Sequence, residues 1–162
     1  MRKAMVFILL INFLIVFCSC ESYSNSFLLK NGIKLSFNCV EKYTVVTSSE
    51  NAVAIKNGDK ISGFIQADNW KTDDSSKVTF IKDFSEEILN ISLDDKRIEF
   101  FEIISEEKIF IKFSEEINDN TNEMYLFFYY NKDLNSFAYG RLFPNQIEKK
   151  EVLEILKSIS FK

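Results

Sequence analysis

Short alternating segments, interrupted twice by helical periodicity, determine the fold class of this chain. Ile33, Leu35 and Phe37 alternate with polar residues, which is typical of a half-buried strand. Between residues 75 and 90 the apolar residues instead recur at every third or fourth position, and this pattern returns near residue 152. Many short strands and two helices predict an α+β domain with a mainly antiparallel central sheet and helices packed on it.

Asn-Gly pairs mark two turns between the predicted strands. Asn31-Gly32 best fits a type I′ hairpin turn, and Asn57-Gly58-Asp59 separates two further apolar segments. Gly63, inside the second of these segments, indicates a bulge or a close packing contact. The predicted strands are 27–30, 33–39, 42–48, 52–56, 60–67, 97–104, 108–113, 124–130 and 136–143.

Two segments allow more detailed predictions. Residues 124–130 (MYLFFYY) are apolar on both faces, so we expect a central strand with cover on each side. Asn145 and Glu148 have the spacing of a capping box, and the helix after them, with its apolar face around Ile155, is expected to end the chain. Loops are expected at 68–76, 118–122 and 131–135.

The first twenty residues carry the clearest signal of location. Arg2 and Lys3 precede an apolar run that ends at Phe17, and Cys18-Ser19-Cys20 comes directly after it. A basic start and about 7–15 apolar residues are typical of a secretory signal. The run is shorter than the roughly 20 residues that a membrane-spanning helix needs, which makes a permanent anchor a strained alternative.

This end of the chain resembles a bacterial lipoprotein signal, in which a small residue precedes a cysteine that is lipidated and becomes the first residue. Ser19 before Cys20 fits that pattern, whereas Cys18 would come after the bulky Phe17. The resemblance implies a signal peptide at 1–19 and acyl chains such as palmitate on Cys20, which would hold the protein at a membrane of the cell envelope, on its periplasmic or outer face. Plain secretion is the other alternative.

The charge of the chain beyond residue 20 limits its partners. The whole chain has 20 basic and 24 acidic residues, and since two of the basic residues lie in the signal, the remainder is more acidic than the whole. We therefore expect no nucleic-acid partner and no polybasic lipid-binding surface. We predict a polar tether at 20–26 and a single domain at 27–162.

The sequence offers little catalytic chemistry. It contains no histidine, which removes Ser–His and Cys–His nucleophiles and histidine-bound metals. Its four glycines form no phosphate-binding motif, so no cofactor, metal or catalytic residue is predicted. Cys39 is expected to be a buried structural thiol rather than a nucleophile.

The other candidate sites each have a plain structural interpretation. The four acidic pairs would serve a hydrolase that uses only carboxylates if two of them shared a pocket, but solvated charges explain them as well. Residues 118–123 resemble a calcium loop but lack its glycine and its final glutamate. Tyr125, Phe127 and Tyr129 could line a ligand groove or a core, and Trp70 is a candidate exposed contact. The acidic pairs are Glu86-Glu87, Asp94-Asp95, Glu106-Glu107 and Glu115-Glu116.

The chain resembles the PsbP-like family, which is named for an extrinsic photosystem subunit and is known also in bacterial lipoproteins. The likeness is carried by NGIKLSFNCVEKYTVV (31–46) and EVLEILKSISF (151–161). It implies an α-β-α sandwich and a binding or assembly role without catalysis. We therefore expect a membrane-anchored envelope lipoprotein with a protein partner in the envelope. The alternatives are a carboxylate-only envelope hydrolase and an inhibitor or immunity-type partner of another envelope protein.

Overall fold

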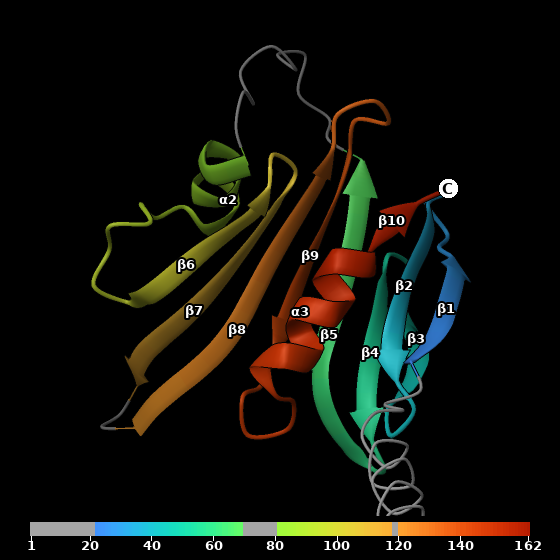
Figure 1. Cartoon of the computed structure of the whole chain (residues 1–162), viewed down its shortest axis with the longest axis horizontal. Coiled ribbons are helices and arrows are strands. Elements are labelled where there is room, and N and C mark those ends of the chain that lie inside the picture. Colours follow the sequence, from blue (N-terminus) through green and yellow to red (C-terminus); the bar gives the residue numbers. More distant parts are fainter. Residues whose placement is uncertain (1–21, 70–80, 118–119) are drawn as a thin grey trace, which may run out of the picture.

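The computed structural model describes residues 22–69, 81–117 and 120–162, which form two antiparallel sheets and two helices (Figure 1). The small sheet has the order β1-β2-β10, and the large sheet has the order β3-β4-β5-β9-β8-β7-β6. This confirms the α+β class. The elements are β1 (Ser22–Leu28), β2 (Lys34–Val40), β3 (Thr44–Ser49), β4 (Ala52–Asn57), β5 (Lys60–Asn69), α2 (Ile81–Leu89), β6 (Ile98–Ser105), β7 (Lys108–Ile117), β8 (Asn120–Asn131), β9 (Ser136–Leu142), α3 (Lys149–Ser158) and β10 (Ser160–Phe161).

The large sheet is the middle layer of the domain. Helix α3 and strand β2 pack on one face, which we call the α3 face, and α2 packs on the opposite face over β7 and β8. Neighbouring residues of β8 divide between the two cores: Phe127 is buried on the α3 face, and Phe128 is buried beneath α2. The prediction of a central strand at 124–130 with cover on both sides is thus confirmed.

The hairpin at the start of the domain differs in detail from the prediction. Gly32 has a φ of +84°, but Asn31 is not among the described residues with positive φ, so the turn is not type I′. The Asn31 side chain bonds to the backbone instead, accepting from the Ile33 amide at 3.2 Å and donating to the Ala67 carbonyl at 2.9 Å. Leu35, Phe37 and Cys39 of β2 all point into the core on the α3 face.

Two predicted irregular segments turn out to be strands. Residues 22–26 pair with β2 as part of β1 rather than forming a tether. Residues 120–122 belong to β8, where they pair with the end of β7, so the predicted loop at 118–122 is wrong for these three residues. Both segments can form strands although their side chains are polar, because these side chains lie mostly at exposed positions.

The last helix begins later than predicted. The amides of Gln146 and Ile147 both donate to the Phe143 carbonyl, so a tight turn precedes the helix. Glu148 is the N-cap and forms the capping box with Glu151, which corrects the predicted Asn145–Glu148 pair. The chain also continues past the helix, since Ser160 and Phe161 pair with β2 as β10.

Three further predictions concern Gly63, the first helix and the loop that contains Trp70. Gly63 has both expected roles: the β4–β5 register shifts next to it, and an added Cβ would lie 2.6 Å from the Arg141 carbonyl oxygen. The described part of α2 starts at Ile81, and Trp70 with the rest of the predicted loop to residue 76 lies outside the described residues. Neither α2 nor α3 is long and apolar enough to cross a membrane.

Candidate functional site

Two surface depressions meet at Arg141, whose side chain lies on the face of the large sheet that is opposite to α3. Gly140 and Leu142 of β9 pack toward the α3 face, against Phe127 and within that core. Because side chains alternate along a strand, Arg141 and Tyr139 project from the opposite face. The two depressions have volumes of about 740 Å³ and 270 Å³, and we call them together the Arg141 groove.

The larger depression combines apolar and hydrogen-bonding groups. It lies where β7 and β9 end and β8 begins, and the turn after β9 closes it with Phe143 and Pro144. Pro144 cannot donate to a sheet, and the chain therefore leaves the sheet there. The lining is completed by Glu115, Thr121, Asn122, Glu123, Met124, Arg141 and Asn145.

The smaller depression extends the groove across β9, β5 and β4. Its floor contains Phe64 and Tyr139, and the Tyr139 hydroxyl is 3.0 Å from Gln66 Oε1. Ser48 and Ser49 of β3 supply hydroxyl groups at its rim. This part of the groove offers an aromatic surface edged by neutral polar groups.

The charged side chains of the groove differ in their partners. Glu123 accepts from Lys112 Nζ at 3.1 Å, and Lys112 Nζ also lies 2.7 Å from Glu99. The hydrogen bond to Glu99 raises the pKa of Lys112, which keeps it cationic. Glu115 lies 3.8 Å from the guanidinium of Arg97. Each groove carboxylate thus has a cation beside it.

Arg141 contrasts with these carboxylates. Its side chain is exposed, and within the described part of the chain its guanidinium takes part in no ion pair or side-chain hydrogen bond. A guanidinium presents its donors as a planar fork that fits a carboxylate or a phosphate in a bidentate manner. The arrangement can hold an anionic group next to an apolar one, with Met124 and Phe143 beside it.

A buried carboxylate on α3 has all its partners inside the domain. Glu151 Oε2 accepts from the Tyr43 hydroxyl at 2.6 Å and from the Glu148 amide at 2.9 Å, and Oε1 lies 2.6 Å from Lys42 Nζ. Its side chain is only 5% exposed. Burial and the bond to Glu151 raise the pKa of Tyr43 far above its ordinary value, so the proton stays on the phenol. This cluster fixes α3 to the chain segment between β2 and β3.

The predicted site residues are mostly structural where the structure describes them. Cys39 is buried, and burial raises the pKa of its thiol to about 11, which fits the predicted inert role. Tyr125, Phe127 and Tyr129 face the core on the α3 side. There Tyr129 stacks on Phe161, with 4.9 Å between the two ring centres. The lipid-attachment candidate Cys20 and the contact candidate Trp70 lie outside the described residues.

The acidic pairs are distributed over separate elements. Glu86-Glu87 lies on α2, Asp94-Asp95 comes after that helix, Glu106-Glu107 forms the β6–β7 turn, and Glu115-Glu116 lies on β7. The described carboxylates and thiols form no group of three that could hold a metal ion. Residues 120–123 of the calcium-like segment are paired in β8.

Sequence reasoning missed both Arg141 and Glu151, although each had a signal. Arg141 is a charged residue inside a strand whose alternate positions are Ala138, Gly140 and Leu142. Glu151 lies four residues before Ile155 and therefore on the apolar stripe of α3. A charged residue between the apolar positions of a strand, or on the apolar stripe of a helix, indicates either an exposed binding group or a buried charge with internal partners.

Comparison with known protein families, curated proteins and solved structures finds no match to this chain. The function therefore rests on the geometry and the chemistry of the chain itself.

Proposed function

We propose that this protein is a lipoprotein of the bacterial cell envelope that is anchored through Cys20 and serves as a non-catalytic binding or assembly module. The domain would be a PsbP-like α-β-α sandwich. The layering supports this proposal, because the large sheet lies between α2 on one face and α3 with the small sheet on the other (Figure 1).

The observation that carries the binding role is the Arg141 groove. An exposed guanidinium without an internal partner among the described residues lies between an aromatic floor and an apolar wall. Arginine and aromatic side chains are enriched among residues that dominate binding energy. The groove suits a partner segment or ligand with an anionic group for Arg141 and an apolar group for Met124 and Phe143.

The position of the groove agrees with membrane attachment. Ser22 pairs with Val40 at the end of β2, and the Tyr43 amide donates to the Val40 carbonyl. The Tyr43 hydroxyl oxygen lies 3.2 Å from the carbonyl oxygen of Gln146, next to Asn145 in the groove lining. The described chain therefore begins at the end of the domain where the larger depression lies, so an anchor at Cys20 would hold that depression toward the membrane.

Mass spectrometry of the mature N-terminus tests the anchor. After expression in a bacterial host, we expect a chain that starts at Cys20 and carries acyl chains, and that sediments with membranes. Cys20→Ala should abolish both acylation and sedimentation, whereas the matched variant Cys18→Ala should change neither. An unmodified chain that starts at Glu21 or later, or one that retains Met1, would refute the lipoprotein proposal.

Photo-cross-linking tests the groove. A photoreactive residue in place of the exposed Asn145 should form a covalent adduct with the partner of the groove when membranes are irradiated. The adduct should disappear when Arg141→Gln is added. Persistence of the same adduct in that double variant would show that Arg141 does not hold the partner.

A further inference from the structure

Strand β6, the last strand of the large sheet, carries exposed apolar side chains. Phe100, Phe101 and Ile103 are 36%, 38% and 54% exposed. Among the described residues β6 pairs with β7 alone, so its other edge presents backbone N–H and C=O groups. Such an edge is a template for pairing with another strand.

The side chains of β6 divide between the two faces of the sheet. Phe101 and Ile103 pair with Ile111 and Ile109, which belong to the core beneath α2. Phe100 and Ile104 point to the α3 face. The ring centres of Phe100 and Phe110 lie 5.8 Å apart, and Ile104 packs against the core on that side. Glu102 pairs with Phe110 and therefore lies on the α3 face as well.

We propose that two copies of this chain associate by antiparallel pairing of their β6 strands around a two-fold axis at Glu102. In this register Phe101 lies opposite Ile103 of the second copy, and Phe100 lies beside its Ile104, which sits at the register shift before Ser105. Both contacts occur twice by symmetry. These four contacts are apolar, and each joins residues on the same face of the continuous sheet, while Glu102 meets its own copy at the axis.

The neighbouring registers are worse. Moving the axis by half a residue would place residues of opposite faces against each other, which the pleat of a sheet forbids. An axis at Phe101 would set Phe100 against Glu102, and an axis at Ile103 would set Glu102 against Ile104. The axis at Glu102 keeps every carboxylate of the central segment away from an apolar partner.

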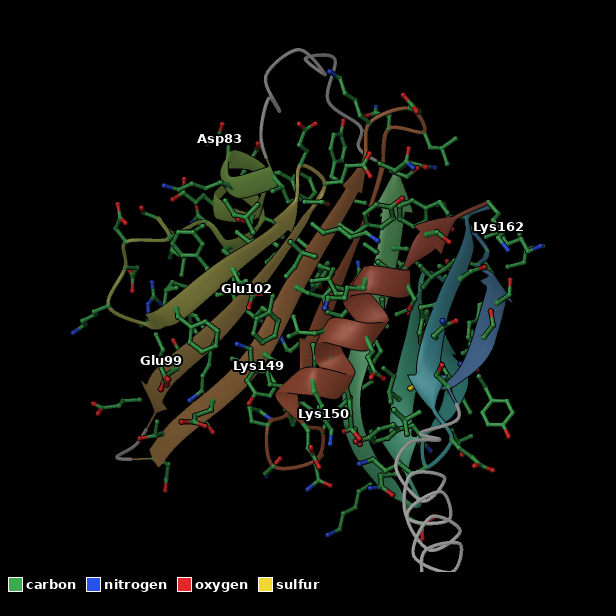
Figure 2. All side chains as sticks on the ribbon, viewed as in Figure 1. Asp83, Glu99, Glu102, Lys149, Lys150 and Lys162 are labelled. Atoms are coloured by element: carbon green, nitrogen blue, oxygen red, sulfur yellow. The ribbon has the colours of Figure 1, made fainter. Side chains whose placement is uncertain are left out.

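The one like-charge contact of this register has a cation beside it. Lys149 Nζ lies 3.5 Å from Glu102 Oε2 and 4.5 Å from the centre of the Phe100 ring. Figure 2 shows Glu102 on β6 and Lys149 at the start of α3, on the same side of the sheet. Two copies would place two Glu102 carboxylates between two Lys149 ammonium groups, an arrangement without net charge.

The ends of β6 limit the pairing to its centre. The register with β7 shifts between Ile98 and Phe100 and again between Ile103 and Ser105. Bulges of this kind twist an edge strand away from further partners. The short segment between them favours a closed dimer with one defined register. This inference does not depend on the Arg141 groove or on its occupant.

Disulfide trapping tests the register. With the axis at Glu102, the two Cα atoms of residue 102 would be about 4.5–5.5 Å apart, within the range that a disulfide bridges. Mild oxidation of membranes that contain the full chain with Glu102→Cys should give a covalent dimer. Ser105→Cys is the control, because its two copies would be about 20 Å apart along the strands. Cys39 is buried and does not compete.

A charge on the edge tests the association itself. In detergent-solubilised protein, Ile103→Lys should abolish the dimer seen by sedimentation, because lysine on an edge strand blocks pairing. Val46→Lys is the matched control on β3, at the other edge, where Val46 is 37% exposed. A monomeric native protein, equal loss of the dimer in both variants, or equal cross-linking of Ser105→Cys would each overturn the proposal.

Discussion

On the α3 face of the large sheet the charged side chain of Glu151 is buried, whereas on the opposite face the guanidinium of Arg141 is exposed. Glu151 has three donors within 2.9 Å, and Arg141 has no ion-pair partner among the described residues. The difference results from coverage, because α3 and the small sheet close one face while α2 covers only part of the other. A charge on a closed face must be satisfied internally, and a charge on an open face is free to bind.

Removal of the buried carboxylate should have the largest effect on this comparison. Glu151→Ala leaves the Tyr43 hydroxyl and the Glu148 amide without their shared acceptor, and removing the acceptor of a part-buried donor costs about 1–3 kcal/mol of unfolding free energy for each donor. Urea denaturation measures the loss. The control is Glu154→Ala on the exposed side of the same helix, which should change stability by less than about 0.5 kcal/mol. Equal losses would remove the distinction between the two positions.

Overpacking should show how tightly the α3 face is closed. A Cβ on Gly140 would overlap the ring of Phe127, which is fully buried. Gly140→Ala should therefore cost about 1–3 kcal/mol of unfolding free energy, measured by urea denaturation. A stability equal to that of the native protein would mean that this face has more free space than the structure shows.

Acid should weaken the closed face through Glu151. Burial opposes its ionisation, but hydrogen bonds from Lys42, Tyr43 and the Glu148 amide outweigh burial, so the pKa of Glu151 lies below its ordinary value of 4.5. A lowered folded-state pKa adds stability above the ordinary value, and this stability is lost as the pH falls through the folded value. The stability gap between the native protein and Glu151→Gln should narrow as the pH falls below about 4.5 in denaturant titrations. A constant gap would contradict this origin.

Substitution on the open face should have the smallest effect on stability. Arg141→Gln removes an exposed side chain that has no internal ion-pair partner among the described residues, so the unfolding free energy should change by less than about 0.5 kcal/mol. Thermal and urea unfolding measure this. A loss comparable to that of Glu151→Ala would show that Arg141 has a structural role, and the groove would no longer be a binding candidate.

Local patterns predicted the elements of this fold better than its tertiary connections. The alternation in β2 and the apolar residues of β8 identified strands because burial on one or both faces leaves a direct trace in the sequence. The short strand β10 could not be predicted, because Ser160 and Phe161 carry no pattern and pair with β2 only after α3 has placed them there. The start of α3 was predicted too early because Asn145 fits a cap locally, whereas the Phe143 carbonyl accepts from the amides of Gln146 and Ile147.

The candidate site was the least predictable part. Arg141 acquires its role only when β5, β8 and β9 lie side by side and leave one face open, and no short motif encodes that arrangement. The envelope location, read from Cys20 and the residues before it, stays a prediction that rests on a local pattern of the sequence.

Amide hydrogen exchange of the full chain, compared in native membranes and in detergent, tests the difference between the two faces most directly. We expect slower exchange in membranes for peptides that cover the groove, at residues 120–126 and 137–143, and no change for residues 150–158 of α3. Equal protection of both regions, or protection of α3 alone, would contradict the account that the closed face stabilises the domain and the open face binds.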